Sequence, residues 1–140
     1  MLANRLRPVI LHLARHLRRE LQTGTVTAGQ VEILALVTGR PGIGINELAG
    51  LVGISPPSMS NAADKLEAAG LLVRSREDPA DRRRVGVTVT VEGERVVRSA
   101  RSSRTAWLAE RLSRLTAEET SALGAAVPAL DAISGGGRPR

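Results

Sequence analysis

Cysteine is absent from this 140-residue chain, which excludes structural disulfides and thiolate metal sites. Phenylalanine and tyrosine are also absent, and Trp107 is the single tryptophan, so the core has to be built from Leu, Val, Ile and Ala. The length suffices for one domain with a modest core. Because a thin aliphatic core leaves apolar surface uncovered, we expect a partner chain to cover it.

Long hydrophobic runs are missing as well. No stretch approaches the roughly 20 apolar residues of a membrane span. Arginine and histidine interrupt residues 1–19, which therefore lack the continuous apolar core of a signal peptide. We expect a cytoplasmic protein with no membrane partner.

Lysine is nearly absent, although the chain is strongly basic. Nineteen of the twenty basic residues are arginine, the net charge is +6, and the isoelectric point is near 11.4. Positive charge favours polyanions, and arginine binds phosphate and guanine edges bidentately. A GC-rich coding genome would also produce this arginine bias. The positions of the arginines are therefore stronger evidence for DNA contacts than their number.

The stretch from residue 53 to residue 90 begins with a helix that has one packed face and one polar face. Ser55 is a good N-cap, Pro56 suits the first helical position, and Gly70 is placed to end the helix. The residues expected to pack recur at helical spacing and are Ala62, Ala63, Leu66 and Ala69. Polar residues fall on the other faces, namely Ser58, Ser60, Asn61, Asp64 and Lys65.

A hairpin is predicted after this helix. Residues 71–76 form one strand, and residues 84–90 form a second strand in which valine alternates with smaller or polar residues. The tip between them holds Asp81, Arg82, Arg83 and Arg84. A helix with small polar residues near its start can enter a DNA major groove, and an arginine-tipped hairpin can reach the backbone or the minor groove beside it. This pattern predicts a winged helix-turn-helix.

Two motifs resemble those of the multiple antibiotic resistance regulator (MarR) family. The sequence DPADRRRVGVTVTVEG resembles its wing signature, with Asp81, Arg83, Arg84, Val89, Thr90 and Gly93 in the matching places. The sequence ELAGLVGIS, residues 47–55, repeats the family pattern for the first helix of the helix-turn-helix. The resemblance extends to about residue 133.

Helical periodicity continues on the N-terminal side of this lobe. Apolar residues repeat every three or four positions at Leu2, Leu6, Val9, Ile10, Leu13, Leu17 and Leu21. Pro8 either bends this first helix or marks its effective start. Thr27 and Gln30 form a capping box for a second helix, whose inner side is Val31, Leu34 and Val37.

Two further helices are predicted on the C-terminal side. Thr90 caps a long helix that stops near Leu115, and Thr116 with Glu119 forms a capping box for the last helix. The apolar face of the last helix is Leu123, Val127, Leu130 and Ile133. Pro128 predicts a kink in it.

The predicted fold is mainly α with a small β-wing. We expect a single MarR-like domain over residues 1–134, with the winged helix-turn-helix at 27–90 and a disordered tail at 135–140. The resemblance implies that residues 1–22 and 91–134 form dimerisation helices, which pack against their counterparts in a second copy of the chain.

The predicted DNA contacts lie on the helix after Ser55 and on the wing. They are Ser55, Pro57, Ser58, Met59, Ser60, Asn61, Lys65, Arg74, Arg76, Arg82, Arg83 and Arg84. The resemblance implies that Asp81 orients Arg83 toward the minor groove. Lys65 could instead pair with Asp64 or Glu67, and Arg74 and Arg76 are either phosphate contacts or internal partners for Asp78 and Asp81.

A ligand pocket is also implied by the resemblance, with His12, Arg15, His16 and Trp107 as candidates to line it. Trp107 could instead fill the core or an interface. His12, His16 and Glu20 have a spacing that could present metal ligands, but the site would need carboxylates or a second protomer to be complete, so we predict no metal and no cofactor. The sequence shows no nucleophile beside a base and no phosphate loop, which argues against an enzyme.

The predicted function is that of a homodimeric, sequence-specific regulator that binds a pseudo-palindromic site in double-stranded DNA. The resemblance implies a repressor relieved by a small lipophilic or phenolic ligand. One alternative is an architectural protein of the nucleoid type, which would bind any sequence through phosphates and lose affinity for all of them in salt. A winged helix kept only for protein interaction would not bind DNA.

Overall fold

The computed structural model describes residues 1–21, 26–76 and 85–135. The helices are α1 (Leu2–Arg19), α2 (Ala28–Gly39), α3 (Ile45–Val52), α4 (Pro56–Ala68), α5 (Val91–Leu112) and α6 (Ala117–Ile133), and the strands are β1 (Ile43–Gly44), β2 (Leu72–Arg76) and β3 (Val85–Val89). The chain falls into two compact units, Met1–Arg104 and Thr105–Arg140. The predicted class, mainly α with a small β-wing, is confirmed.

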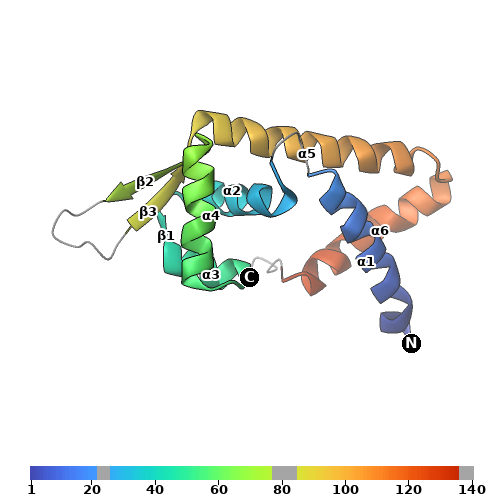
Figure 1. Ribbon diagram of the computed structural model, residues 1–140. Helices are drawn as coiled ribbons and strands as arrows, with labels where there is room; N and C mark the ends of the chain where they lie inside the picture. The colour runs from blue at the N-terminus through green and yellow to red at the C-terminus, as the bar shows by residue number, and fades with distance from the viewer. Residues whose placement is uncertain (22–25, 77–84, 136–140) are drawn as a thin grey trace. The chain divides into compact units, whose positions relative to one another are not determined.

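The three strands form one antiparallel sheet with β3 in the middle (Figure 1). β2 and β3 are the predicted hairpin, and Leu72 pairs with Val89 in their register. The short strand β1 was not predicted; it pairs Ile43 with Val87, so the wing is tied to the segment between α2 and α3. Val87 is fully buried and anchors the sheet in the core.

The predicted helix starts are confirmed by their hydrogen bonds. The side chains of Thr27 and Thr116 each accept from the backbone N–H three residues on. The side chains of Gln30 and Glu119 in turn accept from the backbone N–H of Thr27 and Thr116, so both capping boxes are present. Ser55 caps α4 by accepting from the backbone N–H three residues later. These caps satisfy donors that a helix start otherwise leaves open.

Two local expectations were wrong, and one alternative is excluded. α1 runs from Leu2 through Pro8, so this proline does not mark the start of the helix. α5 ends at Leu112 instead of Leu115. Ala69 does not join the buried face of α4 because it is the C-cap residue, where the chain leaves the helix toward Gly70. Gly70 has a φ of +74°, as predicted for a helix-ending glycine.

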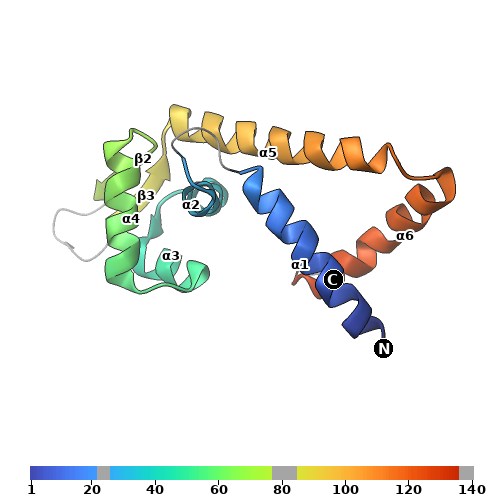
Figure 2. The ribbon, with the colours of Figure 1, turned by 45° about the vertical axis from the view of Figure 1, so that its right-hand side comes forward.

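One aliphatic core unites α2, α3, α4 and the sheet. Figure 2 shows these helices and strands grouped together. The fully buried side chains of largest volume in this core are Leu34, Leu48, Met59, Leu66, Leu72, Val37 and Val87. A smaller cluster joins Leu21 to α2 and to Ala100 of α5. The core therefore fixes α4, the predicted recognition helix, against the strands of the wing.

The start of α5 is held against β2 by Thr90 and Gly93. The Thr90 hydroxyl donates to the Gly70 carbonyl over 2.6 Å and accepts from the Gly93 N–H over 3.1 Å, which confirms the predicted cap. A Cβ on Gly93 would lie 2.3 Å from the Leu71 carbonyl oxygen and 2.5 Å from Val89 Cγ1. Only glycine permits this approach without displacing the backbone.

α1 and α6 each show an apolar face that the described chain does not bury. No residue of α1 is buried, and Val9, Ile10 and Leu13 are exposed. No residue of α6 is buried either, and its exposed apolar residues include Leu123, Val127, Leu130 and Ile133. None of the described helices has the length and hydropathy of a membrane span.

Candidate nucleic-acid interface

Helix α4 presents three stripes of side chains, because residues three, four and seven positions apart share a face. The packing stripe is buried and consists of Met59, Ala63 and Leu66. The exposed stripe consists of Ser58, Asn61 and Lys65. The flank stripe consists of Ser60, Asp64 and Glu67, which follow the packing stripe by one residue and so lie about 100° around the helix from it.

The exposed stripe is built at the N-terminal half of α4. The Ser55 hydroxyl donates to the Ser58 hydroxyl over 2.9 Å, so two predicted contacts are preordered at the helix start. Pro57, Asn61 and Lys65 are exposed, and Ser60 is half-buried. The free N–H groups and positive dipole end of a helix favour anions there. This face offers small polar groups to a groove.

Met59 was wrongly predicted to contact DNA. Its side chain is 0% exposed and packs in the main core. The spacing from Met59 to Ala63 and Leu66 completes the packing stripe, and methionine fills an irregular gap well. Its side chain cannot reach a base while α4 stays folded.

The turn into α4 follows from Gly53, which adopts a φ of +80°. The N–H groups of Gly53 and Ile54 both donate to the Ala49 carbonyl, over 2.9 and 3.1 Å. Ala49 itself is buried. A small residue at this point lets α3 and α4 cross closely, as a helix-turn-helix requires.

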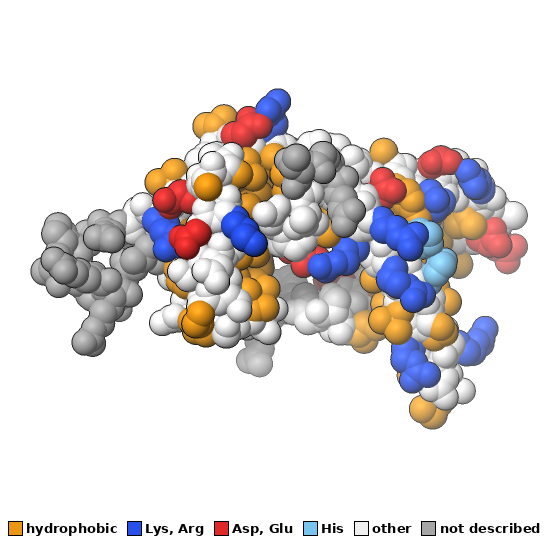
Figure 3. Space-filling view, in the orientation of Figure 1, with side chains coloured by type: hydrophobic (Ala, Val, Ile, Leu, Met, Phe, Trp, Pro, Cys, Tyr) orange, Lys and Arg blue, Asp and Glu red, His pale blue; other side chains and the backbone are white. Residues whose placement is uncertain are grey.

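Arg74 on β2 binds α4. Its Nη2 donates to the Ser60 carbonyl over 2.8 Å and to Asp64 Oδ1 over 2.7 Å. Its backbone N–H donates to Glu67 Oε2 over 3.3 Å, and its Nε lies 3.9 Å from the same oxygen. Figure 3 shows acidic and basic side chains next to one another where α4 lies beside the strands. These partners on α4 were missed because only the fold brings residues seven to fourteen positions apart together.

Comparison with known proteins decides the family. The family model described as MarR matches residues 26–85. An HTH-type transcriptional regulator of Mycobacterium bovis, Mb0904, is 31% identical over 132 residues, which cover 94% of this chain and 92% of that protein. The chain belongs to the MarR family. It is thus a DNA-binding transcriptional regulator with a winged helix-turn-helix.

Two further transcriptional regulators are similar to this chain. The crystal structure of a putative transcriptional regulator from Pseudomonas aeruginosa superposes with a TM-score of 0.82 at 31% identity, covering 96% of this chain and 94% of that one. The HTH-type transcriptional repressor MdtR of Bacillus subtilis is 31% identical over 94 residues, 67% of this chain and 60% of that protein.

The arginines of the MarR wing signature fall outside the described residues. These are Arg83 and Arg84. Arg82, Asp81 and the alternative partner Asp78 lie outside the described residues as well. Arg76 is the last residue of β2, but the structure does not describe its side chain. The predicted roles of these residues stay predictions.

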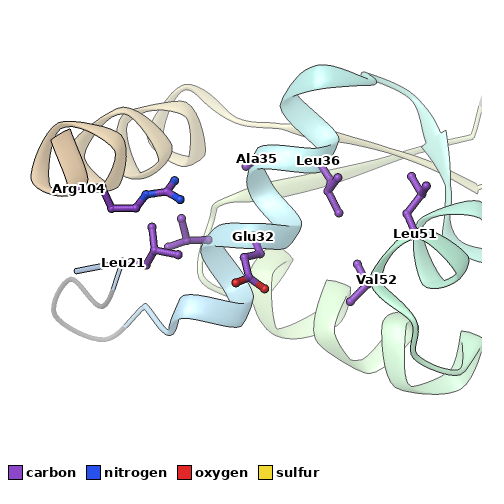
Figure 4. A pocket seen from close by; sticks show the side chains of 8 residues that line it. Leu21, Glu32, Ala35, Leu36, Leu51, Val52 and Arg104 are labelled. Carbon is purple, nitrogen blue, oxygen red and sulfur yellow. The ribbon is translucent and has the colours of Figure 1, made fainter. Parts of the chain in front are cut away.

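A pocket of about 450 Å³ opens in the unit that contains the MarR DNA-binding lobe (Figure 4). It is lined by Leu21, Val31, Glu32, Ala35, Leu36, Leu51, Val52 and Arg104. Six of these are apolar, and Arg104 and Glu32 supply charges of opposite sign. Glu32 also pairs with Arg18 over 2.6 Å.

The residues predicted from the sequence to line a ligand pocket are not among those that line this one. His12 and His16 lie on α1 with their Nε2 atoms 3.2 Å apart, and Arg15 is exposed on the same helix. Trp107 belongs to the second unit, where the Arg111 guanidinium carbon lies 3.7 Å from its ring centroid. Within the described ranges, no three His, Asp or Glu side chains are grouped to hold a metal ion.

Proposed function

We propose that this MarR-family chain is a homodimeric repressor that reads a pseudo-palindromic operator with α4 and contacts the adjacent backbone or minor groove with its wing. The observation that carries the proposal is the exposed stripe of α4, which lies opposite a packing stripe locked in the core. Its DNA contacts would be Ser55, Pro57, Ser58, Ser60, Asn61 and Lys65, with Arg76 and Arg82 to Arg84 on the wing. The name of MdtR as a repressor supports the same direction of control.

The unburied apolar faces of α1 and α6 support the homodimer. Each helix repeats exposed leucine, valine or isoleucine along one side. Covering such faces removes apolar area from water at about 25 cal/mol per Å². A twofold dimer would place two copies of α4 about one turn of DNA apart, in successive major grooves.

The pocket beside α2 supports relief by a ligand. Its volume lies in the range of small-molecule sites, and its apolar walls with Arg104 suit a lipophilic acid of the phenolic kind. Such a ligand would act by favouring a dimer whose recognition helices are misspaced for DNA. The protein would bind its partners without catalysing a reaction and without a cofactor.

The deciding experiment compares two duplexes of equal length, the protein's own upstream region and a scrambled version of it. We expect a preference for the native region that survives to about 200 mM salt. Equal binding to both that is lost in salt would favour the architectural alternative. Absence of binding to either duplex would favour a protein-interaction role.

Arg83→Ala should weaken operator binding by about 1–3 kcal/mol without unfolding the dimer, because a minor-groove arginine contacts DNA only in the complex. Fluorescence anisotropy with labelled duplex measures the loss. Arg101→Ala removes the same charge at an exposed position on α5, and this variant should bind DNA nearly as tightly as the unchanged protein does. Equal losses of affinity for the two variants would mean that Arg83 contributes only its general positive charge and makes no specific contact with DNA.

Asn61→Ala should change which sequence is preferred more than how tightly DNA is bound. An asparagine side chain can pair bidentately with adenine, worth about 1–3 kcal/mol of discrimination. Selection of bound duplexes from a random pool measures the preference, with Asn4→Ala on exposed α1 as the control. A uniform loss across all sequences would argue against base reading by Asn61.

A further inference from the structure

The flank stripe places two carboxylates beside the face that would meet DNA. Asp64 and Glu67 follow Ser60 at spacings of four and seven residues, between the packing stripe and the exposed stripe. The Asp64 side chain is 65% exposed and that of Glu67 is 49% exposed. Negative charges at this position repel the phosphates that α4 has to approach.

Arg74 forms ion pairs with both carboxylates. Its Nη2 bonds Asp64 over 2.7 Å, and its Nε faces Glu67 over 3.9 Å. The Arg74 side chain is only 25% exposed, so the Asp64 pair is less screened by water than a pair at the open surface. The hydrogen bonds of Nη2 to Asp64 and to the Ser60 carbonyl direct the guanidinium at α4.

Arg74 also fixes how α4 is rotated against the sheet. One strand residue holds three members of the flank stripe, through a backbone N–H to Glu67 and through a side chain to Asp64 and to the carbonyl of Ser60. In the sheet, Arg74 pairs with Val87, which is buried in the core. Rotation of α4 about its axis would therefore break bonds to a strand that cannot follow.

We propose that Arg74 is a positioning residue for DNA binding, which neutralises Asp64 and Glu67 and sets the rotation of α4 without contacting DNA itself. The inference rests on the proposed DNA-binding role of α4. It gives Arg74 an internal role, which was one of the two alternatives from the sequence, but with Asp64 and Glu67 as partners instead of Asp78 and Asp81.

A double-mutant cycle distinguishes a positioning role of Arg74 from a direct contact between Arg74 and DNA. Arg74→Ala should weaken binding to the upstream duplex about tenfold, because Asp64 is then unmasked. Asp64→Asn should change binding about twofold or less in the unchanged protein, but should recover most of the tenfold loss when combined with Arg74→Ala. Glu118→Gln, an exposed acid on α6, is the matched control and should rescue nothing.

Salt dependence gives a second readout that a loss of fold would not mimic. A direct phosphate contact predicts that Arg74→Ala reduces the slope of log affinity against log salt by about one. Masking predicts that the slope of the double variant returns to that of the unchanged protein. Arg74→Lys keeps the charge that neutralises Asp64 but not the forked geometry, so it should bind DNA more tightly than Arg74→Ala. If Arg74→Ala is too unstable to assay, combining Arg74→Lys with Asp64→Asn gives the same test of coupling between the two residues.

The outcomes are distinguishable. Additive effects of Arg74→Ala and Asp64→Asn, or a slope reduced by about one in the double variant, would overturn the positioning role while leaving the proposed function intact. Failure of the unchanged protein to bind any duplex would overturn the proposed function and this inference together.

Discussion

Met59→Ala is expected to lower the free energy of unfolding by about 2–5 kcal/mol. The Met59 side chain is fully buried in the middle of the packing stripe, between α4 and the rest of the core. Truncation removes three heavy atoms from contact and leaves a cavity that an aliphatic core with few large side chains cannot readily fill. Chemical denaturation at equal protein concentration measures the change, since dimer stability depends on concentration.

The matched control for this prediction is Met59→Leu. Leucine conserves the volume closely, and its cost should stay below about 1.5 kcal/mol. Asn61→Ala, two positions away on the exposed stripe, should alter stability by no more than about 0.5 kcal/mol. If Met59→Ala kept full stability but changed the preferred DNA sequence, Met59 would have to leave the core and read bases.

Gly93→Ala is expected to destabilise the DNA-binding lobe by about 2–3 kcal/mol. An added Cβ would lie 2.3 Å from the Leu71 carbonyl oxygen, so α5 would have to move away from the β2 end of the sheet. Overpacking of this kind typically costs about 1–3 kcal/mol, and backbone atoms yield less than side chains do. The helix propensity of alanine would return only about 0.5–1 kcal/mol of that loss.

Gly50→Ala is the comparison for Gly93→Ala. Gly50 also lies inside a helix, α3, but nothing comes within 4 Å of the Cβ that it would gain. It should therefore raise stability by roughly 0.4–1 kcal/mol. Thermal unfolding of the two variants should shift in opposite directions, and a shift in the same direction would contradict the close approach at Gly93.

Local signals in the sequence predicted the helices well because each depends on a few neighbouring residues. The capping boxes at Thr27 and Thr116 need only a partner three positions on, and both are present. Gly53 and Gly70 end their helices with positive φ values, which few other residues adopt. The winged helix-turn-helix followed from the order of these signals.

Contacts between segments that are distant in the sequence were harder to predict from it. β1 is only two residues long and carries no alternating pattern of its own, so its pairing with β3 could be seen only in the fold. Arg74 was expected to meet phosphates or the acids of the wing tip, whereas its partners lie on α4. Met59 stands beside polar residues in the sequence, and only the rotation of α4 decides that it points inward.

The aliphatic composition leaves the protein with a single fluorophore in a useful place. Trp107, half-buried under the Arg111 guanidinium, lies in the unit that starts at Thr105, while the DNA-binding lobe contains no aromatic side chain that emits. Its emission therefore reports on the C-terminal unit, and far-ultraviolet circular dichroism reports on helices throughout. Two melting curves that fail to coincide would reveal, without any label, that the two units lose their structure at different temperatures.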